Sequence, residues 1–223
     1  MSALSRRWWL FVGLLVLPLI GCAQSTSSGP PVPTVTPSGG PIGRAIFAGG
    51  CFWCVEADFD KVPGVLSTVS GYIGGSVANP TYQQVASKLT GHAEAVEVRY
   101  DPQRVSYAQL LEYFWRTIDP TDGNGQFCDK GSPYRSAIFA LDDEQLRLAR
   151  ESLRALERRK PFAAAIRTEV LPASTFYPAE DYHQDFYRTN PVRYEYYRFA
   201  CGREARLQAL WGKDAARLPA GLK

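Results

Sequence analysis

The order of apolar segments in this 223-residue chain predicts a two-layer α+β sandwich. Short apolar runs, typical of strands, alternate with longer runs that repeat about every 3.6 residues, typical of helices. Glycine or proline separates many of these runs. The order is strand, helix, strand, strand, helix, strand, then an extra helix and strand, which favours a ferredoxin-like sandwich. An irregular C-terminal tail, rich in tyrosine and arginine, is expected to follow.

The first half of this sandwich is expected to hold three strands and one helix. Gly49-Gly50 should turn the chain after the first strand, and Pro63-Gly64 should end the helix. Apolar and charged residues alternate in the third strand, as in a strand with one buried face. The predicted elements are a strand at 44–48, a helix at 51–62, and strands at 65–73 and 95–100.

The second half is expected to hold two helices and two strands. Ser106 can cap a helix whose apolar side chains share one face. The longest helix should open with acidic residues and close with the basic residues 158–160, which matches the helix dipole, and Pro161 should end it. The predicted elements are a helix after Ser106, a strand at 136–141, a helix at 142–160 and a strand at 166–171.

The charge balance excludes strong electrostatic binding of nucleic acid. The chain has 25 Lys and Arg against 22 Asp and Glu, a formal net charge of +3. Without Arg6 and Arg7, the 23 basic and 22 acidic residues that remain give +1. A body this close to neutral lacks the basic surface that phosphate backbones require.

The first 21 residues resemble a bacterial lipoprotein signal peptide. Positive charge precedes the uncharged apolar stretch 8–20, which is too short to span a bilayer unaided. The segment ends in Leu-Ile-Gly-Cys, similar to the lipoprotein processing site. The resemblance implies cleavage before Cys22, lipidation of Cys22, and export to the cell envelope, where a membrane anchor would hold the protein facing the periplasm.

Residues 22–42 are expected to be a lipidated cysteine followed by a flexible linker. Fifteen of the 19 residues at 24–42 are Ser, Thr, Gly or Pro, and none is charged. Such a segment cannot bury enough apolar surface to offset its ordering entropy. The folded domain is therefore expected over 43–223, with its tail beginning at about residue 190.

The residue pattern around Cys51 predicts a reactive thiol. Cys51 follows two glycines and opens a helix, where backbone N–H groups and the helix dipole should lower the pKa of its thiol. Phe52 and Trp53 could form an apolar pocket beside it. The alternative is an inert cysteine buried among core aromatics.

Cys51 and Cys54 also form a Cys-x-x-Cys motif, which is typical of redox-active pairs in exported proteins. Two structural disulfides among the four cysteines after Cys22 are an alternative. A metal site is not expected, because the chain has no second Cys-x-x-Cys and its two histidines are isolated.

Six motifs follow one another in order between residue 44 and about 212. They are Gly50-Cys51-Phe52-Trp53, Gly71-Tyr72-Ile73-Gly74-Gly75, Asn79-Pro80-Thr81-Tyr82, Gly91-His92-Ala93-Glu94-Ala95-Val96, Tyr134-Arg135-Ser136-Ala137-Ile138 and Ala179-Glu180-Asp181-Tyr182-His183-Gln184. Through these motifs the chain resembles the A-type peptide methionine sulfoxide reductase family. The resemblance implies thiol-dependent reduction of the S epimer of methionine sulfoxide, free or in peptides, and hence repair of oxidised proteins.

The resemblance also implies a role for each motif residue. Cys51 matches the nucleophile that attacks the sulfoxide sulfur, and Glu94 matches the acid that protonates the sulfoxide oxygen. A donating Glu94 should be neutral, so we expect it to be buried beside Trp53 with a raised pKa. The remaining matches are the hydroxyl donors Tyr82 and Tyr134, the methyl-binding residues Phe52 and Trp53, and the substrate-side residue Asp129.

The reaction should leave Cys51 as a sulfenic acid, which a second thiol converts to a disulfide. In the family this thiol often lies in a C-terminal tail, which favours Cys201 as the resolving cysteine. Cys54 and Cys128 remain alternatives, and Cys54 stands where some relatives have glycine. The resemblance implies no cofactor, a monomer, and a thioredoxin-like electron donor.

Two other functions compete with the reductase. A thiol–disulfide oxidoreductase would use Cys51 and Cys54 and would not depend on Glu94. A non-enzymatic lipoprotein binding module would carry fully oxidised, inert cysteines. Glu94, Tyr82 and Tyr134 separate the three hypotheses, because only sulfoxide chemistry needs an acid and hydroxyl donors facing Cys51.

Overall fold

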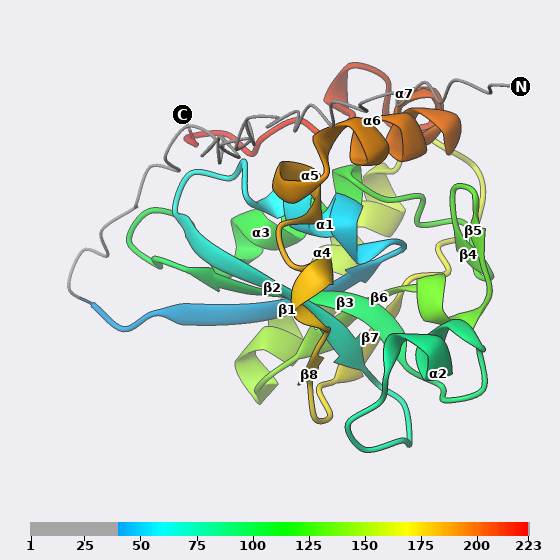
Figure 1. Ribbon diagram of the computed structural model, residues 1–223. Coiled ribbons are helices and arrows are strands. Elements are labelled where there is room, and N and C mark those ends of the chain that lie inside the picture. Colours follow the sequence, from blue (N-terminus) through cyan, green and yellow to red (C-terminus); the bar gives the residue numbers. More distant parts are fainter. Residues whose placement is uncertain (1–39, 223) are drawn as a thin grey trace, which may run out of the picture. The chain divides into compact units, whose positions relative to one another are not determined.

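A computed structural model describes residues 40–222, which fold around a mixed sheet of six strands (Figure 1). The strand order is β7-β6-β1-β3-β2-β8, with β6 and β7 parallel and the other neighbours antiparallel. The signal peptide, Cys22 and most of the expected linker lie outside the described residues. The sheet strands are β1 (Gly43–Gly49), β2 (Val65–Ile73), β3 (Ala93–Tyr100), β6 (Ser136–Ala140), β7 (Glu169–Pro172) and β8 (Tyr177–Pro178).

Helices pack on one face of this sheet and form the main core with it. Phe47 of β1 lies between the rings of Phe59 and Phe114, with ring centroids 4.8 and 4.9 Å away. Alternate residues of neighbouring strands, such as Val96 and Ile138, join the same cluster. The helices are α1 (Phe52–Phe59), α3 (Tyr107–Arg116) and α4 (Asp143–Arg159), with the short α2 (Tyr82–Ala86) at the end of the sheet.

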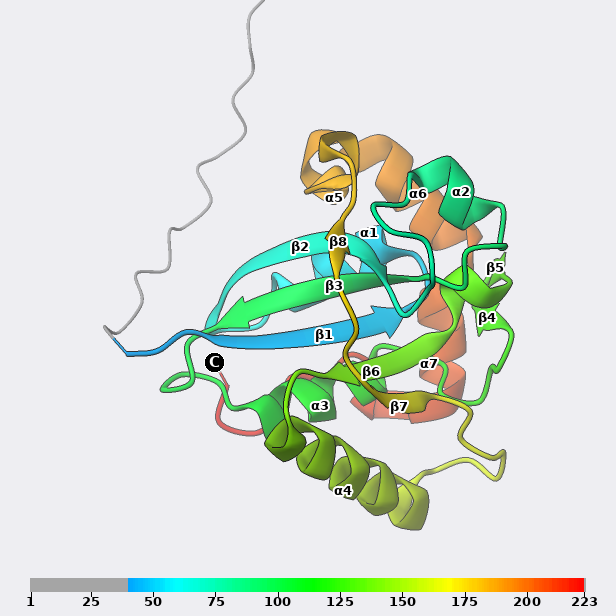
Figure 2. The ribbon, with the colours of Figure 1, turned by 90° about the horizontal axis from the view of Figure 1, so that it is seen from below.

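The opposite face of the sheet is covered by the segment that joins β7 to β8. Figure 2 shows this segment crossing the sheet from one edge to the other. Its Phe176 packs on a second buried cluster that includes Ile46, Ala95 and Phe139. The crossing ends at β8, which brings residues 179–184 beside β2.

The regular elements agree closely with their sequence patterns. The strand expected at 65–73 is β2 with the same bounds, and α4 lies within one residue of its predicted start and end. Ser106 caps α3 by accepting a hydrogen bond from the backbone N–H of Gln109, whose side chain bonds back to Ser106. Local patterning therefore determines most of the central architecture.

The prediction of an irregular C-terminal tail was wrong. Three helices follow residue 185: α5 (Phe186–Thr189), α6 (Pro191–Ala200) and α7 (Arg203–Trp211), and Figure 1 shows them above α1. Pro191 begins α6, where its missing N–H costs nothing, and Leu207, Leu210 and Trp211 of α7 are buried. The short strands β4 (Gly125–Gln126) and β5 (Asp129–Lys130) were also not predicted.

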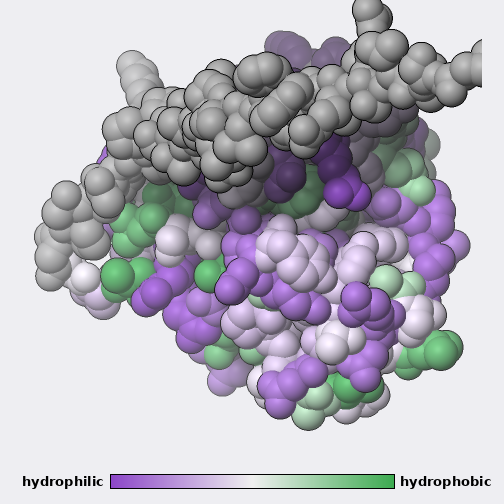
Figure 3. Space-filling view, viewed as in Figure 1, coloured by the Kyte–Doolittle hydropathy of each residue, from purple (hydrophilic) through white to green (hydrophobic). Residues whose placement is uncertain are grey.

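The surface of the described domain is mixed in character. On the face seen in Figure 3, hydrophobic residues form separate patches among hydrophilic ones. Single exposed hydrophobic side chains of this kind are ordinary on protein surfaces. Within residues 40–222, each helix is too short or too polar to serve as a membrane span.

Candidate active site

A glycine turn at the end of β1 places Cys51 at the start of α1. Gly50 has φ +87°, and a Cβ there would lie 2.6 Å from the Cβ of Gln126, so both conformation and space require glycine. Cys51 occupies the N-cap position of α1. Its side chain is buried, with 7% exposure, at the edge of a small cavity.

This cavity, with a volume of about 70 Å³, gathers the predicted active-site residues. They come from elements far apart in the chain: the start of α1, α2, β3, β5 and the 3₁₀ turn Ser132–Tyr134. One further residue, from α6, was not predicted. The lining residues are Cys51, Phe52, Trp53, Tyr82, Glu94, Asp129, Tyr134 and Tyr197.

Glu94 has the burial that an acid catalyst requires. It is 2% exposed, and its Oε2 accepts a hydrogen bond of 3.1 Å from the backbone N–H of Phe52. Burial raises the pKa of Glu94 to about 8, although the Phe52 hydrogen bond opposes this shift. The expected burial and raised pKa of Glu94 are therefore both present, and the carboxyl is neutral at pH 7.

Burial reverses the acidity expected for Cys51. The prediction of a lowered pKa was wrong: burial raises the pKa of the Cys51 thiol, and the hydrogen bond to Cys54 and the Cys54 charge raise it further. The physical reason lies at the helix start. The first N–H of α1 donates to Glu94, so the helix terminus serves the carboxyl group.

Aromatic rings form the apolar wall of the cavity. Trp53 stacks on Phe186 with ring centroids 3.7 Å apart and an interplanar angle of 8°. Its indole N–H donates to Nδ1 of His183 at 3.1 Å, which fixes the orientation of the ring. Burial, followed by the charge of Glu94, raises the pKa of both Tyr82 and Tyr134, so both hydroxyls stay protonated and can donate.

Tyr197 is the cavity residue that the sequence did not reveal. Its hydroxyl donates a hydrogen bond to Oδ2 of Asp129, and it meets Trp53 edge-on at 5.8 Å. Burial raises the pKa of Tyr197, with the charges of Cys51 and Asp129 adding to this effect. The signal for Tyr197 was the helical spacing of α6, which places it one turn before Cys201.

The four cysteines of the described chain form a free pair and a bonded pair. Cys51 and Cys54 are buried free thiols in side-chain contact with one another. Cys201, the expected resolving cysteine, forms a disulfide with Cys128 and so is not a thiol in this structure. These two cysteines and Asp129 are also the one group of three potential metal ligands within residues 40–222, and the disulfide removes its thiolates.

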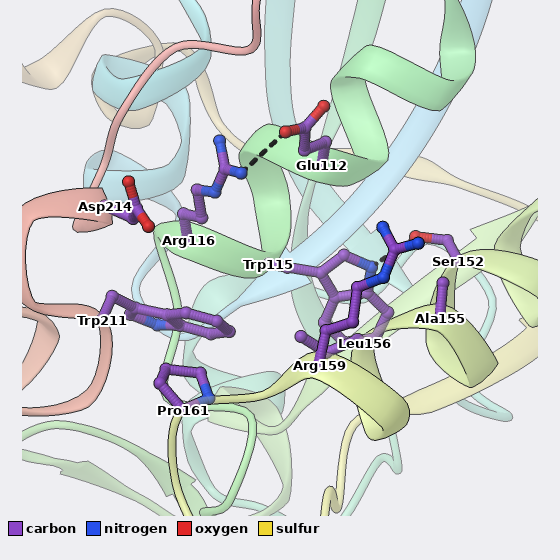
Figure 4. Close-up of a pocket in the computed structure, with 10 residues that line it drawn as sticks. All are labelled: Glu112, Trp115, Arg116, Ser152, Ala155, Leu156, Arg159, Pro161, Trp211 and Asp214. Atoms are coloured by element: carbon purple, nitrogen blue, oxygen red, sulfur yellow. Dashed lines mark hydrogen bonds and ion pairs between the residues drawn. The ribbon is translucent and has the colours of Figure 1, made fainter.

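A second cavity lies between α3, α4 and the end of α7, and it shares no lining residue with the first. Its volume is about 330 Å³, and Trp115 and Trp211 line it from different helices (Figure 4). Both indole N–H groups are already used, by Ser152 Oγ at 2.7 Å and by the carbonyl of Ile118 at 3.1 Å. Its charged residues include the ion pair Arg116–Glu112.

Comparison with protein families identifies the family of the chain. The family model described as peptide methionine sulfoxide reductase matches residues 43–215. The chain belongs to the peptide methionine sulfoxide reductase family. All eight residues that line the small cavity fall inside the matched range.

Known members of this family resemble the chain over most of its length. "Peptide methionine sulfoxide reductase MsrA 2" of Rhizobium meliloti is 56% identical over 171 residues, which cover 77% of this chain and 84% of the relative. Methionine sulfoxide reductase A of Corynebacterium diphtheriae has a TM-score of 0.63 at 34% identity, with 74% of this chain and 87% of that one covered. Reduced Mxr1 of Saccharomyces cerevisiae has a TM-score of 0.65 at 29% identity, with coverage of 71% and 91%.

Proposed function

We propose that the chain reduces the S epimer of methionine sulfoxide to methionine, in oxidised proteins and peptides and as the free amino acid. Family membership supports the reaction, and one observation carries the assignment of residues. A nucleophilic sulfur, a neutral carboxyl group and two protonated hydroxyls line a single small apolar cavity. Sulfoxide reduction needs this combination, because the sulfur is attacked while its oxygen gains a proton.

The chemistry assigns one role to each group. Cys51 attacks the sulfoxide sulfur, and Glu94 gives a proton to the oxygen as negative charge develops there. The hydroxyls of Tyr82 and Tyr134 donate hydrogen bonds to the same oxygen, while Phe52 and Trp53 hold the substrate methyl group and Asp129 bounds the polar side. Methionine leaves as a sulfide, and Cys51 keeps the oxygen as a sulfenic acid.

The cavity also supports the choice between the competing hypotheses. Thiol–disulfide exchange at Cys51 and Cys54 develops no oxyanion and so needs no proton donor of this kind. Burial of Glu94 carries an energetic cost, reflected in its pKa of about 8, that a reaction with an oxyanion would explain. The contact between Cys51 and Cys54 is compatible with both reactions.

The deciding experiment gives the separate S and R epimers of a blocked methionine sulfoxide to reduced protein. Release of methionine from the S epimer alone, lost in Cys51→Ser and strongly reduced in Glu94→Gln, is the expected result. Disulfide exchange with a model dithiol, measured on the same samples, should not depend on Glu94. A folded, reduced protein that reduces neither epimer would exclude the reductase.

The setting of the enzyme is a further part of this proposal. The sequence of residues 1–22 supports an exported lipoprotein, anchored through Cys22 in the cell envelope of a bacterium and facing the periplasm. The linker would carry a monomeric catalytic domain over 43–223, and a thioredoxin-like protein would return its electrons. Incorporation of labelled fatty acid that disappears in Cys22→Ser would test the anchor.

We further propose that the sheet contains a ferredoxin-like core. The order β6-β1-β3-β2, with all three neighbouring pairs antiparallel, supports a ferredoxin-like core. In this description β7 and α4 are the extra strand and helix, and β8 is a second edge strand.

A further inference from the structure

The hairpin of β4 and β5 meets the C-terminal helices through three consecutive residues at its tip. Each of them contacts one residue of α6, of α7 or of the short turn between these helices. The contacts are a ring–guanidinium contact of 4.4 Å between Phe127 and Arg203, the disulfide of Cys128 with Cys201, and the hydrogen bond from Tyr197 to Asp129. The disulfide is the covalent contact of the three, and along the hairpin it lies between the other two.

The two ends of this hairpin are held in different ways. At the base, the fully buried side chain of Gln126 accepts a hydrogen bond of 2.8 Å from the N–H of Asp119 and donates one of 2.7 Å to its carbonyl. At the tip, Phe127 has φ +54°, in the left-handed region that a residue with a Cβ rarely adopts. The base is therefore fixed to the body of the protein, whereas the tip depends on its contacts with the C-terminal helices.

The disulfide joins two residues of the active-site cavity through short connections. Asp129 and Tyr197 both line the cavity at Cys51. Asp129 directly follows Cys128 in the chain, and Tyr197 lies one helical turn before Cys201. A backbone hydrogen bond of 2.9 Å from the N–H of Cys201 to the carbonyl of Tyr197 closes that turn. A change at the disulfide is thus passed on to both lining side chains.

We propose that Cys128 and Cys201 are positioning residues of the active site, whose disulfide holds Asp129 and Tyr197 together and so strengthens binding of the sulfoxide substrate. This inference rests on the proposed function, which supplies that substrate. With the disulfide closed, this part of the cavity wall is ordered before the substrate arrives, and binding does not bear the cost of ordering it. The edge-on contact of Tyr197 with Trp53 extends the effect to the wall that holds the substrate methyl group.

The same bond makes substrate affinity depend on thiol reductants. Cys128 is exposed, so a dithiol can reach the disulfide. One thiolate of the dithiol attacks it and forms a mixed disulfide, and the second thiol then displaces the protein sulfur. Two electrons and two protons pass to the protein, which leaves Cys128 and Cys201 as thiols and the dithiol as a disulfide. The tip of the hairpin then has no covalent link to the C-terminal helices, and substrate binding weakens.

The first test is a single turnover without reductant, because methionine leaves before Cys51 enters any disulfide. Protein with Cys51 free and the Cys128–Cys201 bond closed receives increasing concentrations of blocked S sulfoxide. The rate of methionine release gives a half-saturating concentration and a limiting rate. The open state is provided by Cys128→Ser/Cys201→Ser and by wild-type protein after dithiol treatment and removal of the dithiol. Peptide mapping by mass spectrometry verifies the state of each sample.

The open state should show a half-saturating concentration about tenfold higher than the closed state, with a limiting rate within about twofold, because side chains that were ordered beforehand must be ordered on binding. A general loss of folded protein would lower the limiting rate instead. A half-saturating concentration that does not rise would overturn the positioning role, whatever the limiting rate does. No methionine release by folded, closed wild-type protein would overturn the proposed function itself.

The second test asks whether the disulfide acts through the contact between Tyr197 and Asp129. Tyr197→Phe keeps the ring and the disulfide but removes this hydrogen bond, and it should raise the half-saturating concentration severalfold. Added to Cys128→Ser/Cys201→Ser, it should change this concentration little further, because both changes remove the same restraint. Effects that multiply would overturn this route from the disulfide to the cavity.

Lys130→Gln is the matched control, since it breaks a different contact of the same hairpin. Lys130 forms an ion pair with Asp122, and its side chain is 53% exposed. Its loss should leave the half-saturating concentration within about twofold of wild type, as expected for a pair screened by water. A rise in this control as large as that of the open state would show that any loosening of the hairpin weakens binding, and would overturn the specific role of the disulfide.

Discussion

The two cavities of this molecule differ in size and in chemistry, and the smaller one holds the more reactive groups. The cavity at Cys51 has a volume of about 70 Å³, and the cavity between α3, α4 and α7 has about 330 Å³. The small one combines a thiol with a carboxyl group whose pKa is about 8. In the large one, both indole N–H groups are bonded and Arg116 pairs with Glu112.

This contrast shows that the state of the polar groups distinguishes the two sites better than cavity volume does. In the large cavity, both indole N–H groups and the Arg116–Glu112 pair are bonded within the protein. In the small cavity, burial raises the pKa of both Glu94 and Cys51, so folding works against the charged form of each group. Substitutions should therefore affect catalysis in one cavity and stability in the other.

The largest effect is expected from Cys51→Ser. A serine hydroxyl cannot attack the sulfoxide sulfur and accept its oxygen as a thiol does, so turnover should disappear. Steady-state methionine release measures this, with Trp115→Phe in the large cavity as the matched control. Activity within about twofold of wild type is expected for the control, because Trp115 does not line the small cavity. Equal losses in both variants would contradict the contrast.

Glu94→Gln should have the next largest effect, a fall in kcat of about 10²- to 10³-fold, because the amide cannot give a proton to the sulfoxide oxygen. The pH profile gives the sign. Loss of the Glu94 proton should lower wild-type kcat/KM as pH rises through about 8, relative to the variant. The residual kcat/KM of Glu94→Gln should lack this fall. Wild-type and Glu94→Gln profiles of the same shape between pH 7 and 9 would exclude Glu94 as the acid.

The same substitution should stabilise the folded protein. In the unfolded chain the carboxyl group loses its proton near its ordinary pKa of 4.5, while in the folded chain it keeps it up to about 8. Wild-type stability should therefore fall as pH rises from about 4.5 to 8, by at most ~1.4 kcal/mol per pH unit. Glu94→Gln removes this loss, so urea unfolding should show a difference between variant and wild type that grows across this window. A difference that shrinks with pH would show that the carboxyl group is not neutral in the folded state.

The smallest effect is expected in the large cavity. Ser152→Ala removes the acceptor of the Trp115 indole N–H and should lower the free energy of unfolding by about 0.5–1.5 kcal/mol. Thermal unfolding measures this loss, and kcat/KM should stay at the wild-type value. A clear change in kcat/KM would show that the two cavities are coupled.

Most of the fold could be predicted because its signals are local. The capping pattern at Ser106, the alternation in β3 and the dipole-matched ends of α4 each depend on a few consecutive residues. The prediction of an irregular tail failed because α6 buries little apolar surface: Tyr194 is its one buried residue. Its stability comes from distant contacts, such as the ion pair of Arg198 with Asp58, which no local pattern contains.

The residues that line the candidate site could be predicted from the sequence better than their pKa values could. The six motifs contain six of the eight residues that line the small cavity, and the family resemblance added Asp129. The predicted acidity of Cys51 was wrong because burial raises the pKa of its thiol, and burial depends on distant segments that no local pattern contains. The first N–H of α1 also donates to Glu94, 42 residues away from Phe52 in the sequence. The pairing of Cys128 with Cys201 was equally inaccessible, since four cysteines allow three pairings and their sequence spacing does not choose among them.

The small size of the cavity at Cys51 has a consequence for which oxidised proteins can be substrates. With 7% of Cys51 exposed, a sulfoxide reaches the sulfur only when its whole side chain extends away from the backbone that carries it. A methionine sulfoxide packed in the interior of an intact substrate protein cannot extend into the cavity. One in a loop, at a chain end or in a partly unfolded segment can. The cavity should therefore favour oxidised methionines that project far from their backbone. Repair would go first to substrate proteins that have already begun to lose their structure.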